Sequence, residues 1–467
     1  MSYIAVVGAG ITGLTTAYRL HEQMPGAEIV VVEADDRIGG KIHSSDFADV
    51  PGVDVGADAF LTRVPYATQL TVDLGLSDAL TSPAVAAANV WWNGLHRIPE
   101  GLLLGVPTDL AKLARSHLLT WPGKLRAGLE PILPATGVGA DSVGLLIRKR
   151  FGRQVHERLV DPLVGSIYAA DTERFSLAGV PQILDLASKH RSLLLGARRI
   201  RAKAPPVSGP IFATPTAGMG ALTDALAASL RTSRVTIRTS ERVTAIEPAG
   251  TRWFVSTDTG ADMVVDALVL ATPARTTAPL LATLSVDAAS LLGQFDHAGV
   301  VMVTLALDAA DWPRGLHDSS GYLVPKPVQK WVTAVSFATS KWPHWRATAA
   351  DGSSNYLLRI SLGRDGRDVT GEHDDALLDA ALTEVGHHVG LTLQPSAHRI
   401  SRWPMAFPQY RPGHEDRVVR IERALAGDAP GVFVAGASYH GIGIPACVQQ
   451  GGAAAIAVSH FLDPVRE

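Results

Sequence analysis

The sequence has little cysteine, little net charge and no long hydrophobic run. Among its 467 residues Cys447 is the single cysteine, which excludes an intramolecular disulfide and argues against a cysteine-ligated zinc site or iron–sulfur cluster. With 42 basic and 45 acidic residues the net charge is -3, too small to attract nucleic acid or an anionic membrane in general. We therefore expect no nucleic-acid partner, and any basic site must be local.

Two further absences concern the membrane and metal ions. No stretch approaches the roughly 18 uninterrupted apolar residues of a membrane span, and Met1 to Ile4 lead straight into a strand pattern without the features of a secretory signal. We expect a cytoplasmic protein without a transmembrane span, and leave peripheral membrane contact open. The 16 histidines contain no H-x-x-x-H or H-E-x-x-H pair, so we expect no metal site.

The chain begins with the pattern of a βαβ unit. Residues 3–7 form an apolar run typical of a strand covered on both faces, residues 14–24 keep helical spacing, and residues 29–32 form a second apolar run. Further on, a leucine-rich region from about 80 to 210 is typical of helices. Strands are predicted at 235–238, 243–246, 253–257, 264–271, 300–307, 356–362 and 432–435, and helices at 374–389 and from about 445 to 461.

The turn after the first predicted strand has the G-x-G-x-x-G pattern of a dinucleotide-binding site. Because the chain has 44 glycines, its position between strand and helix is what makes the pattern specific. Gly8 can make the tight turn, Gly10 can let the backbone approach a diphosphate, and Gly13 can let helix and strand pack closely. Glu33 ends the second strand, where a carboxylate can bind ribose hydroxyls and would repel a 2′-phosphate. FAD and NAD both fit this pattern, whereas NADP is disfavoured.

The next residues favour FAD. The stretch from Glu33 to Lys41 reads Glu-Ala-Asp-Asp-Arg-Ile-Gly-Gly-Lys and is similar to the E-x-x-x-R-x-G-G-R/K extension of a large flavoprotein family that includes amine oxidases, phytoene desaturases and protoporphyrinogen oxidases. Gly39 and Gly40 can bring backbone close to the diphosphate while Lys41 supplies a cation. Outside this pattern, Lys41 would simply be a solvated lysine.

A second glycine-rich turn follows the strand at 432–435. Its residues run from Gly436 to Pro445, and proline is favoured as the first residue of a helix. In the flavoprotein family that this chain resembles, the edge of the flavin ring is held at this place, so the resemblance implies that free backbone amides at 442–444 face the ring and favour an anionic reduced flavin. The alternative is an ordinary turn between a strand and a helix.

Several segments resemble the oxygen-dependent protoporphyrinogen/coproporphyrinogen III oxidase family, the flavoenzymes of haem synthesis. The segments are 55–60, 95–101, 159–171, 402–414 and 436–448. The resemblance covers essentially the whole chain, and the stretch at 98–107 is similar to the coproporphyrinogen III oxidases of Gram-positive bacteria. One departure is Ala446, where members of the family commonly have aspartate before the cysteine.

The resemblance implies an α/β fold with three parts. These are a Rossmann-like FAD-binding domain made of residues 1–80, 212–298 and 395–467, a mostly helical inserted domain at 81–211, and a mixed α+β substrate-binding domain at 299–394. It also implies FAD contacts at Gly8, Ala9, Gly10, Ile11, Thr12, Gly13, Glu33, Ala34, Lys41, Gly56, Ala57, Asp58, Ala59, the backbone of Val243, Trp403, Gly436, Ile442, Gly443 and Ile444.

The implied reaction is the oxidation of coproporphyrinogen III to coproporphyrin III by three two-electron hydride transfers to flavin N5, with O2 as the final acceptor. The cofactor carries this chemistry, so few catalytic side chains are expected. His440 is a candidate for proton transfer, or else an exposed histidine. A downstream enzyme of haem synthesis could receive the product. Candidate cations for the substrate carboxylates are Arg63, Lys189, Arg191, Arg198 and Arg199, although a basic run is also typical of a solvated face.

Other functions fit parts of the pattern. Protoporphyrinogen IX could be the substrate, or the same flavin machinery could oxidise an amine or a carotenoid. A binding protein of the GDP-dissociation-inhibitor type would use the fold without redox turnover, but the intact Glu33 and Gly39-Gly40 pattern argues against it.

Overall fold

The N-terminal βαβ pattern belongs to a five-stranded parallel sheet that collects strands from distant parts of the chain. The protein is described by a computed structural model, which covers residues 2–134, 141–203, 209–346 and 354–463. The strands run in the order β12-β2-β1-β16-β22, with every pairing parallel. Their bounds in that order are Val235–Arg238, Glu28–Val32, Tyr3–Val7, Ala267–Leu270 and Val432–Val434. The predicted βαβ unit is confirmed.

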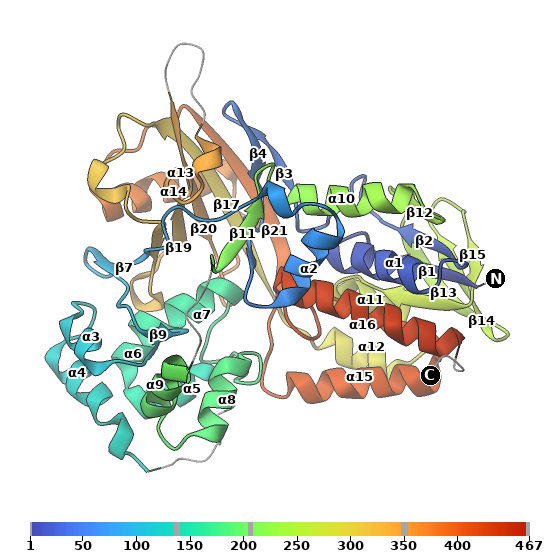
Figure 1. The fold of residues 1–467 in the computed structure, drawn as a ribbon, viewed down its shortest axis with the longest axis horizontal. Coiled ribbons are helices and arrows are strands. Elements are labelled where there is room, and N and C mark those ends of the chain that lie inside the picture. The colour runs from blue at the N-terminus through green and yellow to red at the C-terminus, as the bar shows by residue number, and fades with distance from the viewer. Residues whose placement is uncertain (1, 135–140, 204–208, 347–353, 464–467) are drawn as a thin grey trace.

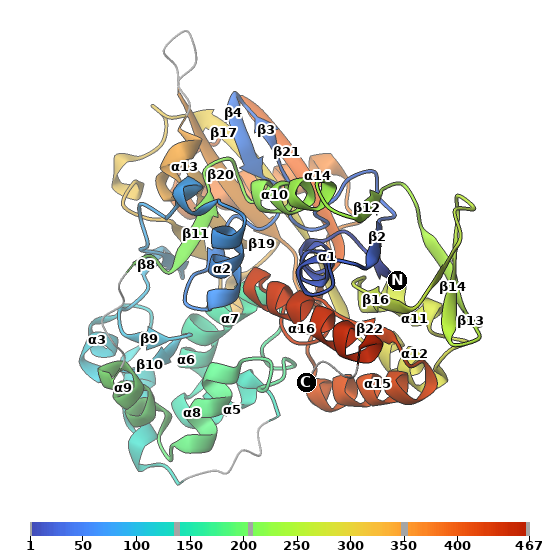
Figure 2. The same cartoon turned by 45° about the vertical axis from the view of Figure 1, so that its right-hand side comes forward.

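Alternating side chains of these strands face two different layers. Ile4 and Val6 pack with one hydrophobic cluster, and Ala5 and Val7 with another, as expected for a strand with both faces covered. The first layer holds α1 (Ile11–Gln23), α2 (Pro65–Asp73), α10 (Gly220–Arg231) and α16 (Ile444–Leu462) (Figure 1). The second holds β13 (Val243–Ala249), β14 (Arg252–Thr257), β15 (Met263–Val265), α11 (Ala274–Leu280), α12 (Val286–Gly293) and α15 (His414–Asp428) (Figure 2).

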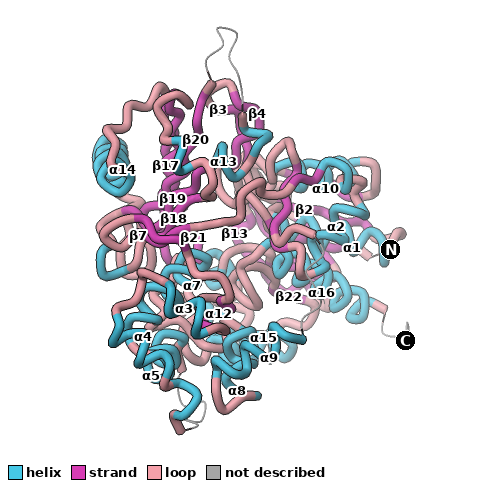
Figure 3. The backbone as a smooth tube through the Cα atoms, turned by 60° about the vertical axis from the view of Figure 1, so that its left-hand side comes forward, coloured by secondary structure: helices cyan, strands magenta, loops and turns pink. Residues whose placement is uncertain are grey.

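A seven-stranded mixed sheet forms the second unit. Its order is β21-β17-β20-β19-β18-β7-β8, and all its pairings are antiparallel except that of β18 with β7. In that order the bounds are Ala397–Pro408, His297–Asp308, Asn355–Leu362, Val332–Phe337, Gly321–Leu323, Asn89–Trp91 and Leu95–Arg97. One face packs on α14 (Asp374–Val389), as Figure 3 shows, and the other on α13 (Ala338–Lys341) and the hairpin of β3 (Ser44–Phe47) and β4 (Val50–Asp54).

Helices dominate the third unit, which has a hydrophobic core of its own. They are α3 (Leu110–Arg115), α4 (Trp121–Gly128), α5 (Val143–Phe151), α6 (Arg153–Val155), a π-helical turn (His156–Val160), α7 (Asp161–Tyr168), α8 (Pro181–Lys189) and α9 (Leu193–Lys203), beside the short strands β9 (Leu102–Leu103) and β10 (Val106–Pro107). The chain enters this unit at β6 (Leu80–Thr81) and returns at β11 (Phe212–Pro215), which pairs with both β6 and β5 (Phe60–Leu61). Its entry and exit therefore lie side by side.

Two of the predicted domain ranges include strands of the seven-stranded sheet. β7 and β8 lie within the range 81–211, and β21 lies within 395–467. The long pairing of β21 with β17 fixes the segment around Trp403 within the seven-stranded sheet. The seven-stranded sheet therefore contains strands from all three predicted ranges.

Candidate cofactor and active site

The glycine-rich turn between β1 and α1 has the geometry of a phosphate-binding loop. Gly8 has φ +101°, which favours glycine. A Cβ at Gly13 would lie 1.9 Å from the Gly8 carbonyl oxygen, so the close packing of this turn requires glycine. A Cβ at Gly10 would meet no protein atom within 4 Å. The surface above Gly10 is therefore open to a ligand, and the first turn of α1 offers free amides to a diphosphate there.

The Gly39-Gly40 turn lies directly against this loop. The Gly39 amide donates to the Ala9 carbonyl at 2.8 Å, and a Cβ on Gly40 would lie 3.4 Å from the Cα atom of Gly10. Arg37 holds the turn from the other side, donating to the carbonyl oxygens of Ile38 and Gly40 at 3.2 and 2.8 Å. The two glycine motifs, separate in sequence, thus make one backbone-lined surface.

Glu33 connects the same loop to the end of β2. One carboxylate oxygen accepts the Ala9 amide at 2.7 Å, and the other accepts the Asp35 amide at 3.0 Å. Each oxygen retains a lone pair, so the carboxylate can still accept ribose hydroxyls. The Glu33 carbonyl accepts the Glu241 amide at 2.9 Å. This bond brings the segment that leads into β13, which begins at Val243, next to the end of β2.

Three separate segments meet where the middle of the cofactor would lie. A Cβ on Gly56 would lie 2.6 Å from the Lys41 carbonyl oxygen and 3.3 Å from the Trp403 ring. The Trp403 indole N–H donates to the Val55 carbonyl at 3.3 Å. Gly56 thus lets β21 approach the first domain closely, and Trp403 lies beside Lys41.

Lys41 and Arg275 form a pair of cations at this junction. The Lys41 ammonium donates to the Ala406 carbonyl, and the Arg275 guanidinium to the neighbouring Met405 carbonyl at 3.0 Å. Desolvation, with a smaller contribution from the charge of Arg275, lowers the pKa of Lys41 to about 8. Among the described residues neither cation makes an ion pair. Both residues are exposed, and their unpaired charges suit an anionic group such as a diphosphate; Arg275 carries no sequence signal that would have revealed it.

Asp58 has a different position from the one its motif suggests. Its carboxylate accepts from Lys341 at 2.8 Å and from the Trp342 indole at 3.0 Å, and lies 3.1 Å from Arg359. Burial alone would raise the pKa of Asp58, but the two cations outweigh it and hold the pKa far below its usual range. The side chain thus ties the turn of Ala57 and Ala59 to β20 and α13, which leaves the backbone of this turn for a cofactor contact.

The second glycine-rich turn prepares the N-terminus of α16. Gly443 is the N-cap residue, and α16 begins at Ile444 with Pro445 in its first turn, as predicted. Gly436, at the start of the turn, has φ +125°, which favours glycine. Further along α16, a Cβ on Gly451 would lie 2.7 Å from the carbonyl oxygen of Thr12 in α1. α16 therefore packs closely on α1, which brings the turn at 436–443 into the same region as the phosphate loop.

Other predicted site residues lie elsewhere. His440 is about half exposed and pairs with Glu422 at 2.9 Å. Lys189 pairs with Asp185 on an exposed face of α8. The remaining candidate substrate cations are exposed: Arg63 between β5 and α2, Arg191 between α8 and α9, and Arg198 and Arg199 on α9. In the described part of the chain no hydrogen bond or ion pair connects these five cations to the predicted cofactor residues, and their role stays a prediction.

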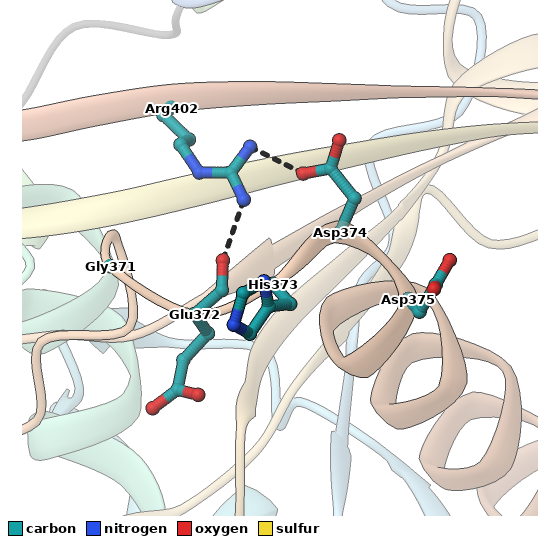
Figure 4. Close-up of a pocket in the computed structure, with 6 residues that line it drawn as sticks. All are labelled: Gly371, Glu372, His373, Asp374, Asp375 and Arg402. Carbon is teal, nitrogen blue, oxygen red and sulfur yellow. Dashed lines mark hydrogen bonds and ion pairs between the residues drawn. The ribbon is translucent and has the colours of Figure 1, made fainter.

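A polar pocket at the start of α14 lies on the other side of β21. Arg402 points into it, pairing with Asp374 at 2.5 Å and donating to the Glu372 carbonyl at 2.6 Å (Figure 4). Neighbouring residues on a strand face opposite sides, so Arg402 and Trp403 serve different surfaces. The Arg402 charge is already paired within this acidic pocket, which separates it from the cofactor site.

The described residues contain neither a cluster suited to a metal ion nor a helix suited to a membrane. No cluster of three or more histidine, cysteine, aspartate or glutamate side chains there could hold a metal ion. In the same ranges, no helix has the length and apolar character to cross a membrane.

The fold and the joined glycine turns define a flavin-dependent oxidoreductase that binds FAD. More particularly, the chain belongs to the flavin containing amine oxidoreductase family, which matches residues 11–459. It is 32% identical to coproporphyrinogen III oxidase of Bacillus subtilis, over 97% of each chain, and 33% identical to that of Mycobacterium tuberculosis, over 98% of this chain and 97% of the relative. A solved structure of a putative protoporphyrinogen oxidase from Exiguobacterium is similar with TM-score 0.86 and 28% identity, over 98% of both chains. The predicted resemblance is confirmed.

Proposed function

We propose that this protein is a coproporphyrinogen III oxidase of haem synthesis. The observation that carries the proposal is the similarity to the two enzymes of that name, at 32% and 33% identity over nearly the full length of both partners. Similarity of this extent includes the helical unit and the seven-stranded sheet, the parts that would contact the substrate, as well as the cofactor turns.

The residues of the chain would hold the cofactor in an extended form. Amides of α1 and the Gly39-Gly40 turn would bind the diphosphate, and Glu33 the ribose. Lys41 and Arg275 would add positive charge nearby. The chemistry that bound FAD would supply is acceptance of a hydride at N5 in three two-electron oxidations, each followed by reduction of O2 to hydrogen peroxide. The protein has to orient the macrocycle. The proton that the macrocycle also releases in each step can pass to solvent water, so the proposal requires no catalytic acid or base.

Protoporphyrinogen IX is the second candidate substrate. The chain is 26% identical to the chloroplastic protoporphyrinogen oxidase of rice, over 98% of this chain and 88% of that enzyme. The two substrates differ in two propionate groups that become vinyl groups, so the choice depends on cations at the pocket wall. An amine substrate has weaker support, because the cyclohexylamine oxidase of Brevibacterium is 18% identical, with TM-score 0.68, and shares the fold alone.

Anaerobic mixing tests the proposal. The purified holoenzyme is mixed without O2 with coproporphyrinogen III, protoporphyrinogen IX or an amine, and bleaching of the visible flavin band is followed. We expect fast bleaching with coproporphyrinogen III, slower bleaching with protoporphyrinogen IX and none with the amine. Admission of O2 should restore the band. If neither porphyrinogen bleaches the flavin, the proposal is wrong.

A cytoplasmic location with peripheral membrane contact is also part of the proposal. α4 and the residues after it expose Trp121, Leu125, Leu129 and Ile132, with three of them spaced four apart on one helical face. Lys124 lies 5.0 Å from the centre of the Trp121 ring. Apolar side chains beside a lysine suit an anionic lipid surface.

Vesicle binding tests this surface. Vesicles with anionic lipid should retain the wild-type protein and lose a Trp121→Ser/Leu125→Ser variant; equal retention of the two would argue against this surface. Hand-off of product to a later enzyme remains an expectation.

A further inference from the structure

The turn between β22 and α16 is held by two buried side chains from other parts of the fold. The Tyr410 hydroxyl donates to the Ala437 carbonyl at 2.7 Å and accepts the Gly441 amide at 2.8 Å. One oxygen atom thus connects the two ends of the turn. Tyr410 follows β21 and is 3% exposed.

Gln450, in the second turn of α16, supports the same backbone from the helix side. Its side-chain oxygen accepts the amides of Gly436 at 3.2 Å and His440 at 3.4 Å, and its NH2 group donates to the Gly441 carbonyl at 3.3 Å. Together with Tyr410 it makes five hydrogen bonds to a stretch of six residues. Buried backbone groups that no strand or helix satisfies need such partners.

The Tyr410 hydroxyl is fixed in position by the packing of its ring. The ring is stacked on His414, with centres 4.0 Å apart, and on Phe175 of the helical unit, 5.9 Å apart. The Tyr410 carbonyl also accepts the Ser176 amide at 2.6 Å. Burial raises the pKa of Tyr410 well above its usual value, so the hydroxyl keeps its proton and can donate and accept at once.

We propose that Tyr410 and Gln450 are positioning residues that aim the amides at 442–444 toward the flavin ring. The inference rests on the proposed placement of the flavin at the N-terminus of α16. A helix N-terminus stabilises negative charge on a bound group only within its first turn, and Gly441, with φ +122°, sits directly before that turn. Loss of either side chain therefore weakens the stabilisation of the reduced cofactor without removing any atom that contacts it.

The test compares Tyr410→Phe and Gln450→Met with a matched control. Tyr356→Phe also removes a buried hydroxyl, which in the wild type bonds to Ser340 at 2.6 Å within the other sheet unit. For each holoenzyme, amide hydrogen exchange of residues 436–444 and the midpoint potential of the flavin are measured. We expect exchange at least about tenfold faster in Tyr410→Phe, because this variant loses both hydrogen bonds of the hydroxyl to the turn. A tenfold weaker preference for reduced flavin corresponds to a potential about 30 mV more negative. The control should match the wild type in both.

The flavin potential decides whether Tyr410 and Gln450 act on the cofactor or only on the turn. Faster exchange with an unchanged potential in both variants would overturn the inference, because the turn would then be loosened without effect on the flavin. An equal shift of potential in the control would overturn it as well. Loss of FAD from a folded Tyr410→Phe, but not from the control, would support it; if Tyr410→Phe does not fold, Gln450→Met decides. The placement of the flavin is tested separately, since FAD should slow exchange at 442–444 in the wild type. If FAD leaves that exchange unchanged, the placement fails, whatever the variants do.

Discussion

Replacing Gly10 by alanine should weaken FAD binding while leaving the protein folded. A Cβ at this position meets no protein atom within 4 Å, and the backbone, with φ −71° and ψ 176°, suits any residue. Alanine restricts the unfolded chain, which stabilises the fold by about 0.4–1 kcal/mol. It is a poorer N-cap than glycine by roughly a similar amount. The two effects oppose each other, so the free energy of unfolding of the apoprotein should change by less than about 1 kcal/mol.

The effect on FAD should be much larger. If the diphosphate lies on Gly10, the added methyl group overlaps with it, and overpacking of this kind costs about 1–3 kcal/mol. The dissociation constant for FAD should therefore rise roughly five- to 150-fold. Thermal unfolding of the apoprotein and titration with FAD measure the two quantities separately.

Two other glycines provide the comparison. Gly26→Ala also adds a Cβ with no protein atom within 4 Å, but it follows the C-terminal end of α1, opposite the glycine-rich turn. It should leave the dissociation constant for FAD unchanged and raise the free energy of unfolding by about 0.4–1 kcal/mol. Gly13→Ala would place Cβ 1.9 Å from the Gly8 carbonyl oxygen and should prevent correct folding. If Gly10→Ala and Gly26→Ala bind FAD equally well, the diphosphate does not pass over Gly10 and the assignment of this loop is wrong.

Three further predictions concern charged groups. Glu33→Ala removes the acceptor of the Ala9 amide and of the ribose, so FAD binding should weaken by about tenfold or more; unchanged flavin content would contradict the ribose assignment. Asp161→Asn breaks a buried ion pair with Arg364 (3.1 Å) between the helical unit and the seven-stranded sheet, so it should lower the free energy of unfolding by about 3–5 kcal/mol. Asp185→Asn, the control at an exposed pair, should lower it by less than about 1 kcal/mol. Similar melting temperatures for the two variants would refute this prediction. Burial lowers the pKa of His414 to about 4. The stabilisation that comes from keeping His414 neutral is therefore complete above pH 6.5. It is lost as the pH falls toward 4, where the free energy of unfolding should be lower by up to about 3 kcal/mol. His414→Gln should flatten the acid side of the stability profile, and an unchanged profile would count against a neutral buried His414.

The cofactor turns could be predicted because their signals are local. A buried strand, a glycine pattern and a helical period occur within about 30 residues, and the same physical constraints fix the turn in any sequence of this kind. The sequence could not show that Asp58 would pair with Lys341 and Arg359, or that Lys41 would bond to a main-chain carbonyl of β21. Those contacts depend on how sheets from remote segments pack, and no local pattern encodes that packing.

The same limit applies to the edges of the seven-stranded sheet. β7 and β8 have three residues each, too few for a period to be recognised, and they lie between helical segments. Tyr410 belongs to a segment with family resemblance, but nothing in its neighbours shows that its hydroxyl reaches Ala437 and Gly441. Contacts between segments that are far apart in the sequence determine the positions of β7, β8 and the Tyr410 hydroxyl.

The order of the strands in the five-stranded sheet has a consequence for biosynthesis. β1 and β2 leave the ribosome first, and β22 and α16, which complete the sheet and supply the amides at 442–444, are the last described elements to emerge. Domains fold as their segments become available during translation. The helical unit of the nascent chain can therefore fold before β22 and α16 are available to complete the FAD site. Capture of the cofactor should therefore follow translation, and a ribosome stalled before residue 432 should carry a chain that binds no flavin tightly.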